Sequence, residues 1–313
     1  MQRPVGMKVA VIMNAGAGSI GADHADERAG AIQAAFAEAG VEAAVHRCAG
    51  AHLTASARAA AATGVDAVVA AGGDGTVSAV ASALVGGDVP LAVLPLGTLN
   101  HFARDLGMPG ELVEAARAIA TGTAERVDAG DVNGRTFVNN SSIGLYPLIV
   151  GARDAERRAT GRGKWRAMLT AAWRVLRRFP LVAVHVQSEA GAVLTRTPFV
   201  FVGNNAYQVG PLSLGQRTCL DGGSLSLYTM RCTGRLQMFW LSLRAIFGRL
   251  DHIEQLEIQR VSELRVELRR RRVRVALDGE VATLDTPLCY AIRPRALPVV
   301  RPSAAQASRE VAA

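Results

Sequence analysis

Three short apolar runs in the first hundred residues each end in a turn built from glycine, asparagine or threonine. The runs are Lys8–Met13, Ala67–Ala71 and Leu91–Leu94. Alanine-rich helical stretches separate them, for example Ala25–Ala39, which is stopped by Gly40. A strand, a glycine-rich turn and a helix in repeated order are typical of a parallel, doubly wound sheet. We therefore expect residues 1–131 to form an α/β domain.

The pattern changes at about Asp131, where short β-branched runs follow one another with little helix between most of them. These runs predict a mainly antiparallel β domain over residues 132–292. The first expected strand of this domain is Thr136–Asn139. Apolar residues occupy even positions in Leu264–Leu268 and odd positions in Val273–Val275. This change of phase predicts a hairpin turn between the two runs, at Arg269–Arg272.

The composition is that of a globular protein, and its 313 residues suit two domains. The four cysteines show no CxxC spacing, so neither a disulfide framework nor a zinc site is expected. No run reaches the roughly 18 apolar residues that a membrane-spanning helix needs. The apolar run Val9–Met13 is too short for a signal peptide. These features indicate a cytoplasmic protein without a spanning anchor.

The charge differs between the two halves of the chain. Residues 1–131 contain 8 Lys and Arg against 14 Asp and Glu, whereas residues 132–313 contain 27 against 13, a net charge of +14. An excess of this size suggests that the second half faces an anionic partner, although a solvated arginine-rich surface is the alternative. Nucleic acid is not favoured, because basic and aromatic residues do not alternate as in known nucleic-acid modules.

A predicted helix at Lys164–Phe179 lies in the basic half. It carries Trp165 and Trp173 on one apolar stripe, and the segment 153–178 around it holds nine Lys and Arg. A basic helix with tryptophan residues suits the interface of an anionic membrane, where the protein would bind peripherally. In the alternative interpretation, both tryptophans pack on the β domain.

The turn after the run Ala67–Ala71 is the strongest chemical signal. It reads GGDGT and opens a helix, so backbone N–H groups and a helix N-terminus point toward one spot that suits phosphate. Asp74 would repel phosphate directly, and it makes sense if it acts through Mg²⁺ or on the proton of a nucleophile. An ordinary tight turn is the alternative. The candidate residues are Gly72, Gly73, Asp74, Gly75 and Thr76.

The following turn reads PLGTLNHFAR and carries Thr98, Asn100 and Arg104. The carboxyl ends of neighbouring parallel strands meet at one edge of a sheet, so this turn, the GGDGT turn and Asn14–Gly18 can together line a nucleotide site. The chain has only two lysines, which makes Arg104 the candidate for a cationic phosphate contact. A salt bridge from Arg104 to Asp105 or to a neighbouring residue is the alternative.

These two turns, followed by VNNSSIGL at 138–145, LDGGSLSL at 220–227 and LDGE at 277–280, resemble the diacylglycerol kinase catalytic-domain family. That family includes diacylglycerol, sphingosine and ceramide kinases, and NAD kinases and 6-phosphofructokinases are its distant relatives. The resemblance extends from about Lys8 to Arg301. It implies a first domain like that of NAD kinase, to which residues 293–303 return, and an ATP- and Mg²⁺-dependent kinase that phosphorylates a lipid hydroxyl at the membrane surface.

The resemblance also implies roles for individual residues. Asn14 would lie beside the nucleotide, and Thr98 and Asn100 would extend its site. Asp278 and Glu280 look like the acidic pair that the family's second domain contributes, and one of them, or Asp74, would orient or deprotonate the lipid hydroxyl. Asp221 looks like the ligand of a structural Mg²⁺.

The sequence departs from the family at several places. Ala15 replaces a proline of the first turn, His101 stands where many members have aspartate, and the stretch 204–215 lacks a run of glycines. The resemblance therefore does not indicate which lipid is the substrate. It leaves the oligomeric state open, and a homodimer is one of the possibilities. The alternatives are a soluble kinase of a small molecule such as NAD, and a catalytically inactive lipid- or nucleotide-binding protein.

Overall fold

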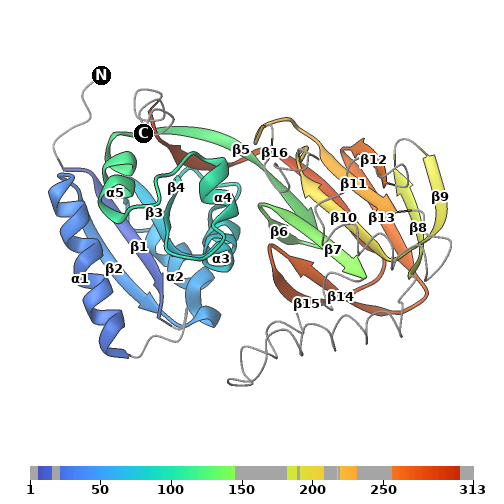
Figure 1. Ribbon diagram of the computed structural model, residues 1–313, viewed down its shortest axis with the longest axis horizontal. Coiled ribbons are helices and arrows are strands. Elements are labelled where there is room, and N and C mark those ends of the chain that lie inside the picture. The colour runs from blue at the N-terminus through green and yellow to red at the C-terminus, as the bar shows by residue number, and fades with distance from the viewer. Residues whose placement is uncertain are drawn as a thin grey trace, which may run out of the picture. The chain divides into compact units, whose positions relative to one another are not determined.

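The computed structural model describes residues 6–15, 22–144, 182–188, 191–207, 217, 219–230 and 256–303 (Figure 1). The chain divides into two units, Met1–Ala129 with Pro294–Ala313, and Gly130–Arg293. Two strands, β5 (Thr123–Val132) and β16 (Leu288–Arg301), each contain one of the two division points. The predicted helix at 164–179 and its basic surroundings lie outside the described residues.

A parallel sheet forms the centre of the first unit. Its strand order is β2-β1-β3-β4, and the end of β16 continues it by pairing Val299 with Leu91 in parallel. The strands are β1 (Lys8–Asn14), β2 (Glu42–Cys48), β3 (Ala67–Gly72) and β4 (Leu91–Pro95). Every residue of β3 is buried, as expected for a parallel strand that is covered on both faces. The α/β class predicted for this part of the chain is confirmed.

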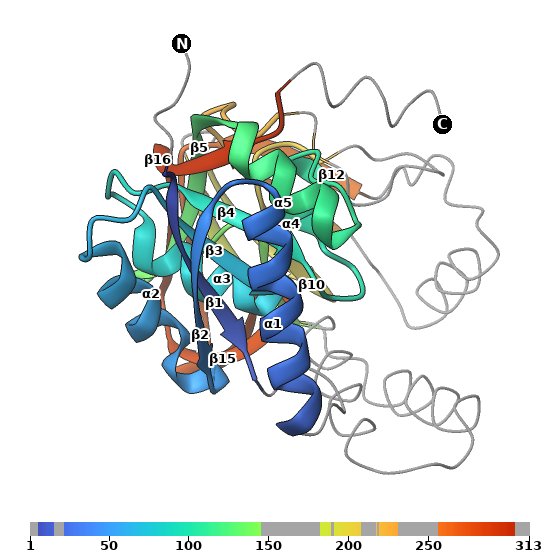
Figure 2. The same ribbon diagram turned by 90° about the vertical axis from the view of Figure 1, so that its left-hand side faces the viewer.

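Helices cover both faces of this sheet (Figure 2). One face carries α1 (Ala22–Glu38) and α5 (Leu112–Thr121), which contact each other, and the other carries α2 (Leu53–Ala61) and α3 (Asp74–Leu84). Two short helices, η1 (Gly50–His52) and α4 (His101–Asp105), were not predicted from the sequence. Among the described residues, none of the helices combines the length and apolarity needed to cross a membrane.

The second unit contains two layers of mostly antiparallel strands, which confirms the predicted β class. One sheet has the order β12-β11-β10-β7-β14-β15, and in the other β16, β13, β8 and β9 follow one another. The strands of the first sheet are β7 (Asn140–Gly144), β10 (Phe199–Asn204), β11 (Leu225–Met230), β12 (Leu256–Val261), β14 (Arg272–Leu277) and β15 (Glu280–Asp285). The remaining strands are β6 (Arg135–Phe137), which pairs with β5, then β8 (Val182–Ser188), β9 (Gly191–Thr197) and β13 (Glu263–Leu268).

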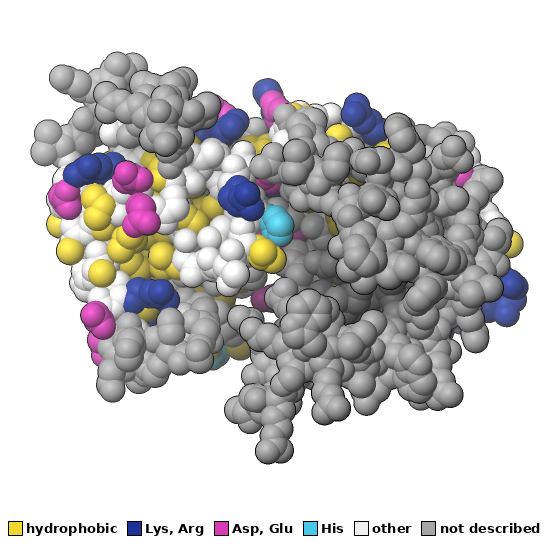
Figure 3. Space-filling view, viewed as in Figure 1, with side chains coloured by type: hydrophobic (Ala, Val, Ile, Leu, Met, Phe, Trp, Pro, Cys, Tyr) yellow, Lys and Arg dark blue, Asp and Glu magenta, His cyan; other side chains and the backbone are white. Residues whose placement is uncertain are grey.

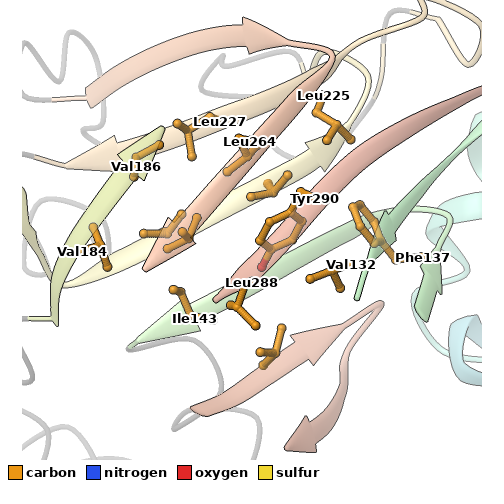
Figure 4. Packing of buried hydrophobic residues seen from close by; sticks show 14 of the residues in the cluster. Val132, Phe137, Ile143, Val184, Val186, Leu225, Leu227, Leu264, Leu288 and Tyr290 are labelled. Carbon is orange, nitrogen blue, oxygen red and sulfur yellow. The ribbon is translucent and has the colours of Figure 1, made fainter. Parts of the chain in front are cut away.

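The core of this unit is formed by apolar side chains from both sheets (Figure 4). Leu225 and Leu227 project from β11, Leu264 projects from β13, and the ring of Tyr290 lies near the edge of Phe137 at a centroid distance of 6.3 Å. Removing this apolar surface from water is the main favourable contribution to the free energy of folding.

The hairpin predicted at Arg269–Arg272 is wrong. The strand before this turn, β13, pairs with β16 and β8, whereas the strand after it, β14, pairs with β15 and β7 in the other sheet. The change of phase in the sequence arises because the chain switches sheets. Leu264 and Val275 bury against the same core from opposite sides.

The single strand predicted at Thr136–Asn139 is also wrong. Two strands, β6 and β7, lie on either side of Val138 and Asn139. The N–H groups of these two residues donate to the carboxylate of Asp278, which is distant in the sequence. The carbonyl of Asn139 accepts the backbone N–H group of Asn204, the last residue of β10.

Candidate functional site

The turn after β3 presents backbone amides at the start of a helix. Helix α3 begins at Asp74, within the GGDGT sequence. The first amides of a helix have no acceptor inside it, so the N–H groups of Asp74, Gly75 and Thr76 are oriented outward beyond the helix end. Together with the helix dipole, they favour an anion at this place.

The turn after β4 packs directly on the turn after β3. The N–H group of Leu96 donates a hydrogen bond to the carbonyl of Gly72 at 3.1 Å. A Cβ atom on Gly97 would lie only 2.4 Å from the Cα of Gly73, which is too close for any side chain. Glycine at position 97 therefore allows the two turns to touch.

Asp74 connects these turns through its side chain. Its Oδ1 accepts a hydrogen bond from the N–H group of Phe102, in the first turn of α4, at 3.3 Å. The carboxylate is half-buried. It lies at the N-terminus of α3, where outward amides and one carboxylate occupy the same place. This combination suits a phosphate group accompanied by a divalent cation.

The structure brings the other predicted residues of the first unit to the same edge of the sheet. Asn14 is the last residue of β1 and neighbours the end of β3, since Met13 pairs with Ala71. Thr98 and Arg104 are exposed on the turn after β4 and on α4. The glycines predicted to complete the first turn, at 16 and 18, lie outside the described residues.

Arg104 makes no ion pair with any described residue, so the salt bridge to Asp105 considered above is not formed. On the face of this unit that Figure 3 shows, basic and acidic side chains both occur. Arg117 pairs with Glu38 and Arg126 with Asp88. The side chain of Arg104 itself is exposed.

In the second unit, the LDGE sequence forms a tight hairpin between β14 and β15. Leu277 pairs with Glu280, and the two residues between them have positive φ angles, 48° at Asp278 and 89° at Gly279. An Asp-Gly pair with two left-handed residues is the preferred sequence of a two-residue hairpin turn.

The carboxylate of Asp278 is buried and accepts three backbone hydrogen bonds. The donors are the N–H groups of Val138 at 2.8 Å, Asn139 at 2.7 Å and Asn140 at 3.0 Å. Amide donors stabilise the ionised form of a carboxylate, and both oxygens are engaged here. Glu280, two residues further along, is exposed. The two acids of this hairpin therefore occupy different environments.

Side chains also bind the carbonyl groups of the same segment. Arg217, which is only 9% exposed, donates hydrogen bonds to the carbonyl of Val138 and to the Oδ1 of Asn139. The hydroxyl of Tyr207 donates to the carbonyl of Asn139 at 2.9 Å, and the Nδ2 of Asn204 donates to Val138. Sequence reasoning missed Arg217, because no motif marks it.

Asp221 lies on an exposed loop before β11. A Cβ atom on the next residue, Gly222, would lie 2.9 Å from the Oδ1 of Asn205. That oxygen is buried and has no hydrogen-bond partner among the described residues. Within the same described part of the chain, no three His, Cys, Asp or Glu side chains gather as a metal site would require. One carboxylate and one unpaired amide oxygen nevertheless match the oxygen ligands that Mg²⁺ prefers.

Comparison with known proteins gives consistent matches. The profile of the family described as Diacylglycerol kinase catalytic domain matches residues 8–132. A diacylglycerol kinase of Mycobacterium tuberculosis is 30% identical over 251 residues, which are 78% of this chain and 79% of that protein. A diacylglycerol kinase of Bacillus subtilis is 43% identical over 109 residues, and the aligned part is 33% of this chain and 36% of the relative.

Solved structures agree with the sequence relatives. A crystal structure from Bacillus anthracis, of a protein proposed to be a diacylglycerol kinase, superposes with a TM-score of 0.71 at 25% identity. The superposition covers 95% of this chain and 98% of the other. The shared fold therefore includes both units.

Proposed function

Because this chain belongs to the diacylglycerol kinase family, we propose that it transfers the γ-phosphate of ATP to the hydroxyl group of a lipid. One observation carries the proposal most strongly. The two glycine turns touch at Gly73 and Gly97, beside the N-terminus of α3 and the carboxylate of Asp74. Phosphoryl transfer depends mainly on positioning and on charge stabilisation, and this arrangement offers both.

Within this proposal, the outward amides of Asp74, Gly75 and Thr76 bind the phosphates, together with the guanidinium of Arg104. Mg²⁺, when bound, neutralises the charge on the phosphates. Asp74 would hold that ion through the half-buried carboxylate. Asn14 and Thr98, at the same edge of the sheet, would complete the nucleotide site.

We propose that the carboxylate of Glu280 accepts the proton of the lipid hydroxyl. Asp278 is committed to three backbone amides, whereas Glu280 is exposed on the same hairpin. As the lipid oxygen bonds to the γ-phosphorus, the bond from that phosphorus to the bridging oxygen breaks. ADP then carries the released electron pair, and the carboxylate of Glu280 takes the proton.

We further propose that the protein works peripherally at an anionic membrane surface on the cytoplasmic side. The net charge of +14 on residues 132–313 supports this. Co-sedimentation with anionic and with zwitterionic vesicles at rising salt tests it. Binding to anionic vesicles alone, weakening with salt, is expected, whereas equal binding to both kinds of vesicle would exclude an electrostatic surface.

Radiolabelled ATP offered with a panel of lipids in mixed micelles tests the activity itself. Label is expected in a lipid that carries a free hydroxyl group, and it should be absent with the Asp74→Asn variant. NAD is offered as a further acceptor, and label in NAD but in no lipid would identify a small-molecule kinase. Binding of ATP without transfer to any acceptor would identify an inactive nucleotide-binding protein.

A further inference from the structure

The side chain of Asn100 is bonded inside its own turn. Its Oδ1 accepts a hydrogen bond from the N–H group of Gly97 at 3.0 Å. Its Nδ2 donates to the carbonyl of Gly97 at 2.9 Å and to the carbonyl of Pro95 at 3.3 Å. An asparagine side chain has one acceptor oxygen and two donor hydrogens. Both ends of this amide are therefore engaged by the backbone of residues 95–97.

The backbone of Asn100 is also special, because it is left-handed, with φ 50° and ψ 45°. Asparagine tolerates this conformation better than most residues other than glycine. The next residue, His101, begins α4. Asn100 therefore determines both how the turn closes and where the helix after it starts.

Two contacts with the GGDGT turn depend on this geometry. On one side of Asn100, Gly97 lies against Gly73 without room for a side chain. On the other side, the N–H group of Phe102 reaches the carboxylate of Asp74. If the turn opened at Asn100, both contacts would be released together.

We propose that Asn100 is a positioning residue, which holds the turn at 95–100 against the GGDGT turn and does not itself contact the nucleotide. The N–H group of Gly97 is occupied by Asn100, so the phosphate donors come from the first turn of α3. The effect of Asn100 on catalysis rests on the proposed kinase function. Its effect on the structure of the turn is independent of that function.

The test compares Asn100→Gly with Gly97→Ala and with the double variant. Glycine keeps the left-handed backbone and removes the side chain. Alanine at position 97 would place its Cβ 2.4 Å from the Cα of Gly73 and 2.7 Å from the Oδ1 of Asn100, so it disturbs both the contact between the turns and the side chain of Asn100. We expect amide hydrogen exchange at Gly97 to rise at least about tenfold in Asn100→Gly, because its acceptor is lost. We also expect affinity for ADP to fall in each single variant.

Both changes act on one contact, so their effects on ADP affinity should not add. The affinity of the double variant should be no more than about threefold below that of the single variant that binds ADP less tightly. Fully additive losses, with unchanged exchange at Gly97, would mean that Asn100 touches the nucleotide and would overturn the proposal. Asn100→Asp keeps the acceptor for Gly97 and loses both donors, so intermediate exchange is expected. It also serves as a second variant if the glycine variant folds poorly.

Asn133 provides a matched control in the second unit. It is also left-handed, with φ 49°, and its side chain also makes three backbone hydrogen bonds, to Asp285, Pro287 and Cys289. Asn133→Gly should lower the melting temperature and leave exchange at Gly97 and ADP affinity unchanged. If the wild-type protein bound no nucleotide, the kinase proposal would fail, and exchange at Gly97 would still decide the role of Asn100.

Discussion

The carboxylate of Asp278 accepts the backbone N–H group of Asn139 at 2.7 Å, although 139 residues separate them in the sequence. The same carboxylate binds the N–H groups of Val138 and Asn140, and the N–H group of Asp278 donates to the carbonyl of Asn140. The hairpin that carries Glu280 is thereby attached to the connection between β6 and β7. The carboxylate of Asp278 thus supports the structure around it.

Replacing Asp278 by Asn should destabilise the protein. An amide offers one acceptor oxygen, and its NH₂ group would face N–H donors. Losing one or two buried hydrogen bonds to a charged group costs about 1.5–3 kcal/mol each, so the free energy of unfolding should fall by about 1.5–6 kcal/mol. Urea denaturation measures this. Asp285→Asn, which removes an exposed partner of Arg272, should cost less than about 1 kcal/mol. Equal stability of the two variants would contradict the assigned role.

Asp74→Asn should reduce turnover without unfolding the protein. If the carboxylate holds the cation that accompanies the phosphates, kcat should fall by at least about 100-fold. Steady-state kinetics and a thermal melt measure the two effects separately. Asp88→Asn, at an exposed acid paired with Arg126, is the control and should turn over normally. A folded Asp74→Asn protein with nearly normal kcat would remove this residue from the mechanism.

Gly72→Ala should disturb the GGDGT turn from within. The added Cβ would lie 2.4 Å from the Oγ1 of Thr76, whose side chain is buried. Such overpacking typically costs about 1–3 kcal/mol, and the displaced helix start should weaken ATP binding. Gly110→Ala is the matched control, because nothing lies within 4 Å of its Cβ. If both alanine variants melt and bind ATP alike, the turn has more room than the structure indicates.

Asp221→Ala should abolish a stabilising effect of Mg²⁺. A ligand that binds only the folded state raises the melting temperature in proportion to the logarithm of its concentration. The wild-type protein should therefore melt at a higher temperature as Mg²⁺ is added, and the variant should not respond. The comparison is made without nucleotide, so that a cation bound with ATP does not contribute. Equal shifts in both proteins would count against Asp221 as a ligand.

The protein should lose stability at high pH because of Tyr290. Burial raises the pKa of Tyr290 to about 12 from 10.0, and the hydrogen bond with Ser141 opposes this in part. The folded state holds the phenolic proton more tightly than the unfolded state, so the contribution is complete below pH 10 and is lost between pH 10 and 12. This increase in the pKa of Tyr290 corresponds to about 2–3 kcal/mol in the free energy of unfolding.

Urea denaturation at pH 9 and at pH 11 measures this contribution, and the decrease should be smaller in Tyr290→Phe, which has no proton to lose. The same decrease in both proteins would mean that other groups cause the alkaline destabilisation. Tyrosinate absorbance provides an independent measure of when the ring ionises.

The class of the fold and the position of the GGDGT turn follow from local properties of the sequence. Runs such as Ala67–Ala71 and Leu91–Leu94 are apolar without alternation, because parallel strands are buried on both faces. The turns after these runs can also be recognised from local chemistry, because glycine allows two backbone segments to approach closely. An aspartate at the start of a helix marks a candidate functional residue whatever the rest of the fold is. Parallel pairing then brings these turns to one edge.

The environment of each polar side chain depends instead on how distant segments pack together. The partners of Asp278 lie about 139 residues away, and those of Arg217 lie on a segment about 78 residues away. The turn at Arg269–Arg272 has the sequence of a hairpin, yet it joins two sheets, because a change of phase does not reveal which strand will be the neighbour. Patterns of burial are local properties of a chain, whereas the partner of a buried hydrogen bond depends on which distant segments pack together. For that reason Asp278 and Glu280 looked equivalent in the sequence and differ in the folded protein.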